Sequence, residues 1–220
     1  MPDISLHETL FTTRAMRHFK PDPVPRADLE YIVEAATMAP SAGNMQIWAF
    51  VVVTDPALRK AIADAHREVG YQYIRDGVLK EPALDEDRRR VYSKAMHNVE
   101  HLDEAPALIV ACLTLPSPDD ADVASGLFGS IFPAAQNMLL AARSRGLGGV
   151  LLTLATDYSP IKPAVHTPVR DLLELPDDVR AVALIPIGYP EGAWGRPWRK
   201  PWQECTHWDR WSDASTSEVP

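Results

Sequence analysis

Four short apolar runs, spaced along the chain, constrain its fold more than any other feature. They cover residues 49–54, 107–113, 150–154 and 181–188, and the first of them is the β-branched run AFVVVT. Runs of this length and composition predict strands, and the first is expected to be buried. The core is therefore expected to be built on these four segments.

Helix patterns occupy much of the chain between these runs. Ser5 and Glu8 form a capping box at the start of the first helix. That helix is expected to turn Leu6 and Leu10 inward. Three prolines between residues 21 and 25 then force an extended connection. Further helices are predicted over residues 29–39, 56–69, 124–145 and 167–175.

Local signals mark several helix ends. Asp55 followed by Pro56 predicts an N-cap with proline in the first turn. Gly146 is the expected left-handed C-cap of the long helix before it, and Pro133 should kink that helix or mark its true start. Residues 70–100 are charged and lack a clear apolar period, so the pattern does not fix their structure; they are a possible lid segment.

Composition excludes several classes of function. A length of 220 residues and the absence of a visible linker predict a single domain over residues 1–220. The net charge of −8 argues against a nucleic-acid partner. Neither a signal peptide nor a membrane-spanning apolar stretch is visible, so a cytoplasmic protein without a membrane partner is expected. Cys112 is interpreted as a core side chain, and Cys205 lies too far away to form a disulfide framework or zinc site with it.

The C-terminal segment, residues 190–220, differs from the rest of the chain. Five of the six tryptophans lie there, among prolines and charges. A proline-rich arm cannot bury that much aromatic area by itself, and tryptophan favours large apolar contacts. The arm is therefore expected to lie on another surface, either the body of the domain or a partner subunit.

Motifs for other chemistries are weak or missing. No Gly-x-Ser-x-Gly elbow, Walker loop or Gly-x-Gly-x-x-Gly fingerprint is present. His97 and His101 match the H-x-x-E-H pattern of inverted zinc peptidases and would share one helix face. A catalytic zinc needs a third protein ligand. A surface helix with two histidines is the favoured interpretation, and no metal site is predicted.

Candidates for phosphate and heterocycle binding are better. Arg14 and Arg17 lie three residues apart, so on a helix they would share one face, and arginine presents a rigid fork of donors to phosphate. A solvated basic face remains the alternative for this pair alone. Residues 40–46 form a turn-rich loop that places Ser41, Asn44 and Gln46 at the entrance of a strand, where amides suit the edge of a heterocycle. A self-capping loop is the alternative there.

Together these pieces resemble the FMN-dependent nitroreductase family. One motif alone would be weak, but five occur in the family's order along most of the chain. The matching stretches are residues 13–19 (TRAMRHF), 39–48 (APSAGNMQIW), 135–149 (AQNMLLAARSRGLGG), 186–190 (PIGYP) and 199–208 (RKPWQECTHW).

The resemblance implies an α+β fold with three layers, in which helices flank a central mixed β-sheet. It also implies an intertwined homodimer with two FMN molecules at the dimer interface. The extended C-terminal arm would wrap the partner subunit, which would supply the surface that its tryptophans lack.

The resemblance also assigns cofactor-binding roles by position. Arg14, Arg17 and Arg199 would converge on the phosphate and ribityl chain. The loop of residues 41–46 would contact the ribityl chain and pyrimidine edge, and residues 152–154 would pass beside flavin N5 and O4. Ala15 replaces the usual serine and Ile47 the usual proline. The full set is Arg14, Ala15, Arg17, Ser41, Ala42, Asn44, Gln46, Leu152, Thr153, Leu154 and Arg199.

The implied activity is a ping-pong hydride transfer. NADH or NADPH would deliver hydride to flavin N5 and leave, and a small electron-poor acceptor such as a nitroaromatic or quinone would take it in the same slot. No side chain need act as nucleophile or general base. The nicotinamide would need no dinucleotide domain, which agrees with the missing fingerprint.

Two alternatives stay open. One is a specialised relative, a reductive dehalogenase resembling iodotyrosine deiodinase, in which Tyr71, Tyr73 and Lys94 would grip the substrate from the lid segment. The other is a flavin-sequestering protein without turnover, in which residues 70–100 would cover the flavin face.

Overall fold

The computed structural model describes residues 4–115, 124–157 and 168–211. Within these residues no helix is both long and apolar enough to cross a membrane. The α-helices are α1 (Leu6–Thr12), α2 (Arg26–Thr37), α3 (Pro56–Gly70), α4 (Glu86–His101), α5 (Ala124–Ser144) and α6 (Pro168–Leu172). The strands are β1 (Trp48–Val53), β2 (Ala107–Thr114), β3 (Gly148–Gly149) and β4 (Val179–Gly188). Short helical turns cover Ala42–Asn44, Tyr71–Arg75, Val78–Lys80, Leu102–Glu104 and Trp202–Cys205.

The strands form one sheet in the order β1-β2-β4-β3. β2 pairs antiparallel with both β1 and β4, and β3 pairs antiparallel with β4. The predicted α+β class is therefore confirmed, but the described strands are all antiparallel where a mixed sheet was expected. The reason is that β2 and β3, which are joined through α5 and run in the same direction, are separated by β4, and β4 pairs antiparallel with both.

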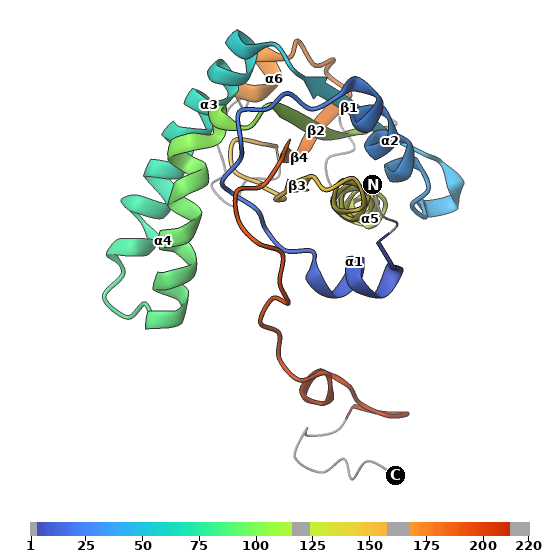
Figure 1. Cartoon of the computed structure of the whole chain (residues 1–220), viewed down its shortest axis with the longest axis vertical. Coiled ribbons are helices and arrows are strands. Elements are labelled where there is room, and N and C mark those ends of the chain that lie inside the picture. Colours follow the sequence, from blue (N-terminus) through green and yellow to red (C-terminus); the bar gives the residue numbers. More distant parts are fainter. Residues whose placement is uncertain (1–3, 116–123, 158–167, 212–220) are drawn as a thin grey trace.

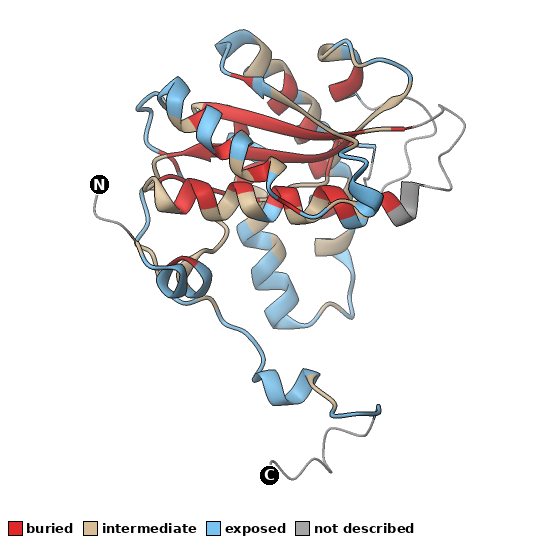
Figure 2. Cartoon of the chain, turned by 90° about the vertical axis from the view of Figure 1, so that its right-hand side faces the viewer, coloured by how far each residue is buried: buried red, intermediate tan, exposed pale blue. Residues whose placement is uncertain are grey.

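Helices cover both faces of the sheet, which gives the expected three layers (Figure 1). α2 and α5 pack on one face against alternate residues of the central strands, such as Ile109 and Ile185. α3 and α6 pack on the other face against the intervening residues, such as Leu108 and Leu184. β2 and β4 are consequently buried on both sides, as their continuous apolar runs predict (Figure 2).

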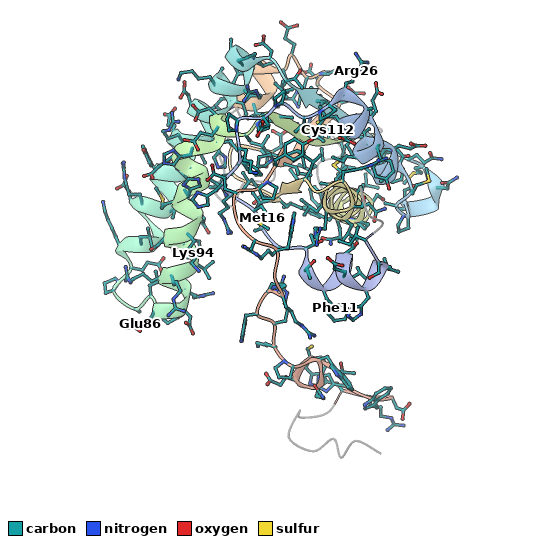
Figure 3. The ribbon with its side chains drawn as sticks, in the orientation of Figure 1. Phe11, Met16, Arg26, Glu86, Lys94 and Cys112 are labelled. Carbon is teal, nitrogen blue, oxygen red and sulfur yellow. The ribbon has the colours of Figure 1, made fainter. Side chains whose placement is uncertain are left out.

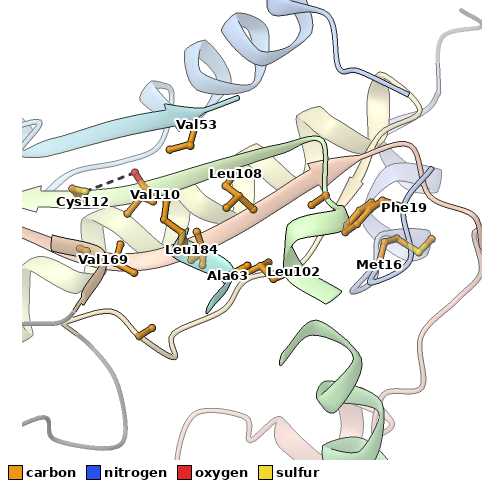
Figure 4. Close-up of a cluster of buried hydrophobic side chains, with 14 residues drawn as sticks. Met16, Phe19, Val53, Ala63, Leu102, Leu108, Val110, Cys112, Val169 and Leu184 are labelled. Carbon is orange, nitrogen blue, oxygen red and sulfur yellow. Dashed lines mark hydrogen bonds between the residues drawn. The ribbon is translucent and has the colours of Figure 1, made fainter. Parts of the chain in front are cut away.

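Figure 4 shows the cluster on the α3 side of the sheet. Met16 and Phe19 of the N-terminal segment reach the same cluster as Val110 and Leu184. Cys112 lies within it and is fully buried, as predicted. Burial raises the pKa of this thiol to about 12, so it is not a reactive thiolate.

Two strands differ from their predictions. β1 was expected to be buried, but it is an edge strand, and most of its residues are only half-buried. The third strand was expected over residues 150–154, but β3 covers only Gly148–Gly149, and Leu152 forms a separate bridge with Leu184. Beyond Leu152 the chain has two more residues than β4 can pair, so regular pairing ends there.

The N-terminal helix begins as predicted but faces the other way. Ser5 accepts a hydrogen bond from the Glu8 N–H at 3.1 Å, which confirms the N-cap. Leu6 and Leu10 are 73% and 51% exposed, however, whereas Thr9 is buried. Thr9 is the buried residue of α1, so the described residues leave the leucine side of the helix largely uncovered.

The other helix signals agree with the structure. Asp55 accepts from the Leu58 N–H at 2.8 Å at the start of α3. Gly146 has a φ of 73° after α5, which is the left-handed conformation that a C-cap glycine adopts. Pro133 is an exception, because α5 begins at Ala124 and runs through this proline, which is therefore not the start of the helix. The predicted start of α6 at Thr167 lies outside the described residues.

The region that the pattern did not fix is helical. α3 continues through the turn of Tyr71–Arg75, and α4 returns antiparallel to it, so the pair projects from the body (Figure 1). Its far end is exposed (Figure 2). The base is held by a small apolar cluster that contains Ile74, Val99 and Leu154.

The described part of the C-terminal arm leaves the body as an extended chain (Figures 1 and 2). Trp194 packs against the core cluster at its base. Further along, Trp198 is 81% exposed and Trp211 is 87% exposed. The described part of the body does not cover these tryptophans, so the remaining expectation is a partner subunit.

Candidate functional site

The segment after α1 carries the N-terminal arginines. It is extended rather than helical: the Met16 N–H donates to the Gly149 carbonyl at 3.0 Å, and Phe19 bridges to Pro190. Met16 is buried. Side chains alternate in an extended chain, so Arg14 and Arg17 do not share a face as a helix would require. That expectation was wrong because pairing with a distant strand replaces the helix at Thr12.

Small residues let this segment approach the sheet. A Cβ on Gly148 would lie 2.8 Å from Cγ of Met16 and 3.3 Å from Cη2 of Trp194. A side chain there would therefore force apart the N-terminal segment and the base of the arm. The glycines of the resembling motif thus bring two remote parts of the chain together.

The base of the arm is fixed by two arginines. Arg14 donates to the Ala193 carbonyl at 2.7 Å. Arg143 of α5 lies with its guanidinium 4.2 Å from the centre of the Trp194 ring and donates to Glu8 at 2.9 Å. This arrangement ties α1, α5 and the arm together at one place.

A cleft of about 880 Å³ opens where these elements meet. Its cations are Arg14, Arg196, Arg199 and Lys200, and no acidic residue is among the described residues that line it. Because the whole chain carries a net charge of −8, this is a local concentration of positive charge. The rest of the lining is Leu10, Phe11, Thr13, Ala15, Gln136, Leu139, Pro197, Trp198, Pro201 and Trp202.

Some of the predicted cofactor-binding residues line this cleft. Arg14, Ala15 and Arg199 meet there although they come from opposite ends of the chain. Arg196 and Lys200 were not among the predicted site residues. The spacing of Arg196, Arg199 and Lys200 in a short basic run was the signal that could have indicated them.

Arg17 does not line this cleft. It is partly buried, and its Nε has no hydrogen-bond partner among the described residues. Burial, assisted by the charge of Arg14, lowers the pKa of Arg17. A buried donor without a partner is costly, so this guanidinium is ready to receive an anion.

The loop of residues 41–46 lies outside the cleft as well. Its conformation is held internally: Gln46 donates from its N–H to Oγ of Ser41 at 3.0 Å and from its side chain to Oδ1 of Asn44 at 3.2 Å. Ala42 donates to Oγ of Ser130 on α5 at 3.0 Å. Asn44 and Gln46 have positive φ values of 54° and 51°. The loop is thus preformed and exposed, yet none of its residues is among those that line the basic cleft.

Residues 152–157 form an irregular turn beside β4. Leu152 exchanges two backbone hydrogen bonds with Leu184, at 2.9 and 2.8 Å. Thr153 is partly exposed, whereas Leu154 is buried in the cluster that anchors the α3–α4 projection. The three residues predicted to pass the flavin therefore lie at the base of that projection.

The predicted substrate residues do not converge. The Tyr71 ring lies under the guanidinium of Arg75, 4.0 Å from its carbon. Burial, together with the neighbouring Tyr92, raises the pKa of Tyr73. Lys94 is exposed on α4 (Figure 3). Within one chain these three side chains do not surround a common ligand.

The two histidines of the zinc-like motif stack against each other. The His97 ring lies 4.5 Å from that of His101 and 3.7 Å from that of His18. Stacked rings do not point their nitrogens at one ion, and the described residues contain no group of three ligands suited to a metal. Burial and the neighbouring imidazoles lower the pKa of His97.

Sequence comparison gives the family. The model of the "Nitroreductase family" matches residues 10–189. The chain belongs to the nitroreductase family. An iodotyrosine deiodinase from Thermotoga neapolitana is 29% identical, over 84% of this chain and 89% of that protein. A 5,6-dimethylbenzimidazole synthase from Rhodobacter capsulatus is 31% identical, over 94% of this chain and 95% of that protein.

Structural comparison agrees with the family assignment. A crystal structure of oxidized iodotyrosine deiodinase, bound to FMN and 3-iodo-L-tyrosine, matches with a TM-score of 0.69 at 24% identity. The match covers 90% of this chain and 96% of that chain. At this identity the likeness establishes the nitroreductase fold.

Proposed function

We propose that this chain is an FMN-dependent oxidoreductase that takes electrons from NADH or NADPH. It passes them to small electron-poor acceptors such as nitroaromatics or quinones. The observation that carries the proposal is the cationic cleft of about 880 Å³ at Arg14 and Arg199. Its size suits a cofactor, and its arginine forks suit a phosphate. Membership of the nitroreductase family supports the redox class.

The chemistry of the donor groups fits FMN. Arg14, Arg199 and Lys200 supply charge for the phosphate, and Ala15 offers only its backbone. The unpartnered Nε of Arg17 supplies a further donor beside Arg14. In the turn after Leu152, backbone N–H groups that have no acceptor among the described residues suit the polar edge of a flavin ring.

FMN, when bound, supplies hydride acceptance and donation. The chain's own residues then bind and orient, and none is required as a general base. The cations hold the phosphate, and the turn presents N–H donors to the ring. Apolar side chains of the cleft, such as Phe11 and Trp198, exclude water from the bound cofactor.

The proposal includes a homodimer. The loop that carries Ser41, Asn44 and Gln46 is preformed but does not reach the basic cleft of its own chain. α1 and the arm also expose apolar side chains that the described residues leave uncovered. A second copy would satisfy both needs: its loop would complete the cofactor site, and the exposed tryptophans would pack on its surface.

The test is spectroscopic. The full-length protein is purified and titrated with FMN, and the bound form is mixed with NADH or NADPH in a stopped-flow instrument. We expect one FMN per chain, loss of the oxidised flavin absorbance on mixing, and its return with a quinone. A protein that refuses FMN, or a flavin that neither nicotinamide bleaches, would falsify the proposal.

A reductive dehalogenase is the second candidate. The 29% identity to the Thermotoga neapolitana iodotyrosine deiodinase favours it. The scattered positions of Tyr71, Tyr73 and Lys94 within one chain do not add support. Iodide release from 3-iodotyrosine by the dithionite-reduced protein, with no turnover of a quinone or nitroaromatic, would replace the main proposal by this one. FMN binding without turnover of any acceptor would indicate a flavin-sequestering protein.

A further inference from the structure

The turn after Leu152 contains more residues than its neighbour strand can pair. Leu152 pairs with Leu184, and the Asp157 N–H donates to the Ala181 carbonyl at 2.8 Å. Five steps along the turn, from 152 to 157, thus span three steps along β4, from 184 to 181, and two residues are surplus. Ala155 absorbs part of this surplus with a φ of 58°, a strained value for a residue with a side chain.

Side chains hold two successive carbonyls of this turn. Oγ1 of Thr156 donates to the Thr153 carbonyl at 2.7 Å. Nδ1 of His66, on α3, lies 3.4 Å from the Leu154 carbonyl oxygen. A carbonyl oxygen can only accept, so His66 must carry its proton on Nδ1 for this bond to exist. The contact joins residues 88 apart in sequence.

His66 is fully buried and makes no other polar contact among the described residues. Its Nε2 has no partner there. Burial lowers the pKa of His66 to about 4, so the ring is neutral at physiological pH. A buried imidazole is costly compared with an apolar side chain. Among the described residues, the Leu154 carbonyl is the polar contact that offsets this cost.

The N–H groups of residues 153–156 find no acceptor in the described parts of the chain. In a trans peptide the N–H points opposite to the C=O. The bond from His66 to the Leu154 carbonyl therefore directs the Ala155 N–H away from α3. The Thr156 bond fixes the Leu154 N–H in the same way. Successive free N–H groups around a positive-φ residue suit an electron-rich ligand edge.

We propose that His66 is a positioning residue of the flavin site. It holds the Leu154–Ala155 peptide so that the N–H groups of this turn are presented to the flavin ring, and it thereby tunes the reduction potential of bound FMN. His66 acts through the backbone and does not touch the cofactor. The inference rests on the proposed function and adds a residue that no motif indicated.

The first test is the tautomer of His66 by two-bond ¹H–¹⁵N spectra of protein labelled at histidine. Free neutral imidazole favours the proton on Nε2, so the expected Nδ1–H form at pH 7 is a distinctive result. The measurement needs neither activity nor bound FMN. A proton on Nε2 would overturn the proposal, because His66 would then have no donor for Leu154.

The second test compares three variants in the FMN-loaded protein. His66→Leu removes the donor, His66→Asn keeps an amide N–H close to the position of Nδ1, and Ile62→Val removes packing one turn earlier on the same helix face. The readout is the ratio of FMN dissociation constants in the oxidised and reduced states. We expect a three- to tenfold change for His66→Leu, about 15–30 mV towards a lower potential. His66→Asn should restore most of it, and Ile62→Val should leave it unchanged.

The outcomes separate the two proposals. If wild-type protein does not bind FMN, the proposed function fails and the positioning role fails with it. If wild-type protein binds FMN but His66→Leu keeps the wild-type ratio, only the positioning role fails. A shift that Ile62→Val reproduces, or that His66→Asn does not reverse, would reduce His66 to a packing residue. If His66→Leu does not fold, the tautomer and the His66→Asn ratio decide.

Discussion

The central strands and the C-terminal arm differ sharply in how far their apolar side chains are buried. β2 and β4 bury almost every residue between two helical layers, all within one chain. The arm leaves Trp198 and Trp211 more than four-fifths exposed. The difference shows that this chain completes its own core but not the surface around its basic cleft.

That difference has a chemical consequence. The basic cleft lies where the body meets the arm, and most of its cations come from the arm itself. Prolines at 197 and 201 keep this part of the arm out of regular structure, so contacts from outside must order it. Cofactor binding and subunit association are therefore expected to depend on each other, whereas core stability should depend on neither.

The largest effect is expected in the core. Ile185→Ala removes a fully buried side chain of β4 and should lower the free energy of unfolding by about 2–5 kcal/mol. Trp198→Ala should change it by less than about 0.5 kcal/mol at a concentration where the protein is monomeric. Urea unfolding of both variants checks the contrast. Equal losses in the two variants would mean that the arm belongs to the folded core.

The free energy of unfolding should also fall in acid, because His66 is buried in the body of the protein. The pKa of His66 is about 4 in the folded protein and near 6.5 in the unfolded chain. The unfolded chain therefore binds more protons between these values, so stability is complete above pH 6.5 and is lost as the pH falls towards 4. The loss should approach roughly 3 kcal/mol. Urea midpoints from pH 7 to 4 check this, and His66→Asn should flatten the dependence; an unchanged slope would show that other groups cause it.

The arm should matter for association instead. In the proposed dimer, replacing both Trp198 and Trp202 by alanine should weaken subunit association by about 2–4 kcal/mol, because buried tryptophans are typical hot spots of interfaces. Sedimentation equilibrium measures the dissociation constant. Val91→Ala, which shortens an exposed apolar side chain on α4, is the control and should leave it nearly unchanged. A double variant that associates like wild type would contradict a role for the arm in the dimer.

Sequence rules predicted the features that depend on near neighbours. The caps at Ser5 and Asp55 and the left-handed Gly146 follow from contacts within a few residues, and all three are confirmed. The orientation of α1 was not predictable in this way. Its pattern identifies an apolar face through Leu6 and Leu10, but the pattern does not tell which surface covers that face.

The site shows the same limit. Arg14, Ala15 and Arg199, which the resemblance assigned to one site, line one cleft, whereas Arg17 does not. The extended form of the N-terminal segment depends on Gly149, far along the chain, so a rule about helix spacing could not foresee it. His66 carries no motif, because its meaning comes entirely from a carbonyl that folding places beside it.

The smallest effect is expected for Arg17 and is an effect on FMN binding. If Arg17 receives the phosphate through its unpartnered Nε, Arg17→Ala should weaken FMN binding by about 1.5–3 kcal/mol, the scale of a charged hydrogen bond. Arg26→Ala is the matched control, since Arg26 is exposed, pairs only with Glu30 among the described residues and lies outside the basic cleft. Fluorescence titration of FMN measures both. Arg14→Ala removes the neighbouring positive charge. If both guanidinium groups hold one phosphate, this variant should lose a similar amount of FMN binding free energy. An effect of Arg14→Ala alone would place the phosphate in the basic cleft and exclude Arg17 from holding it.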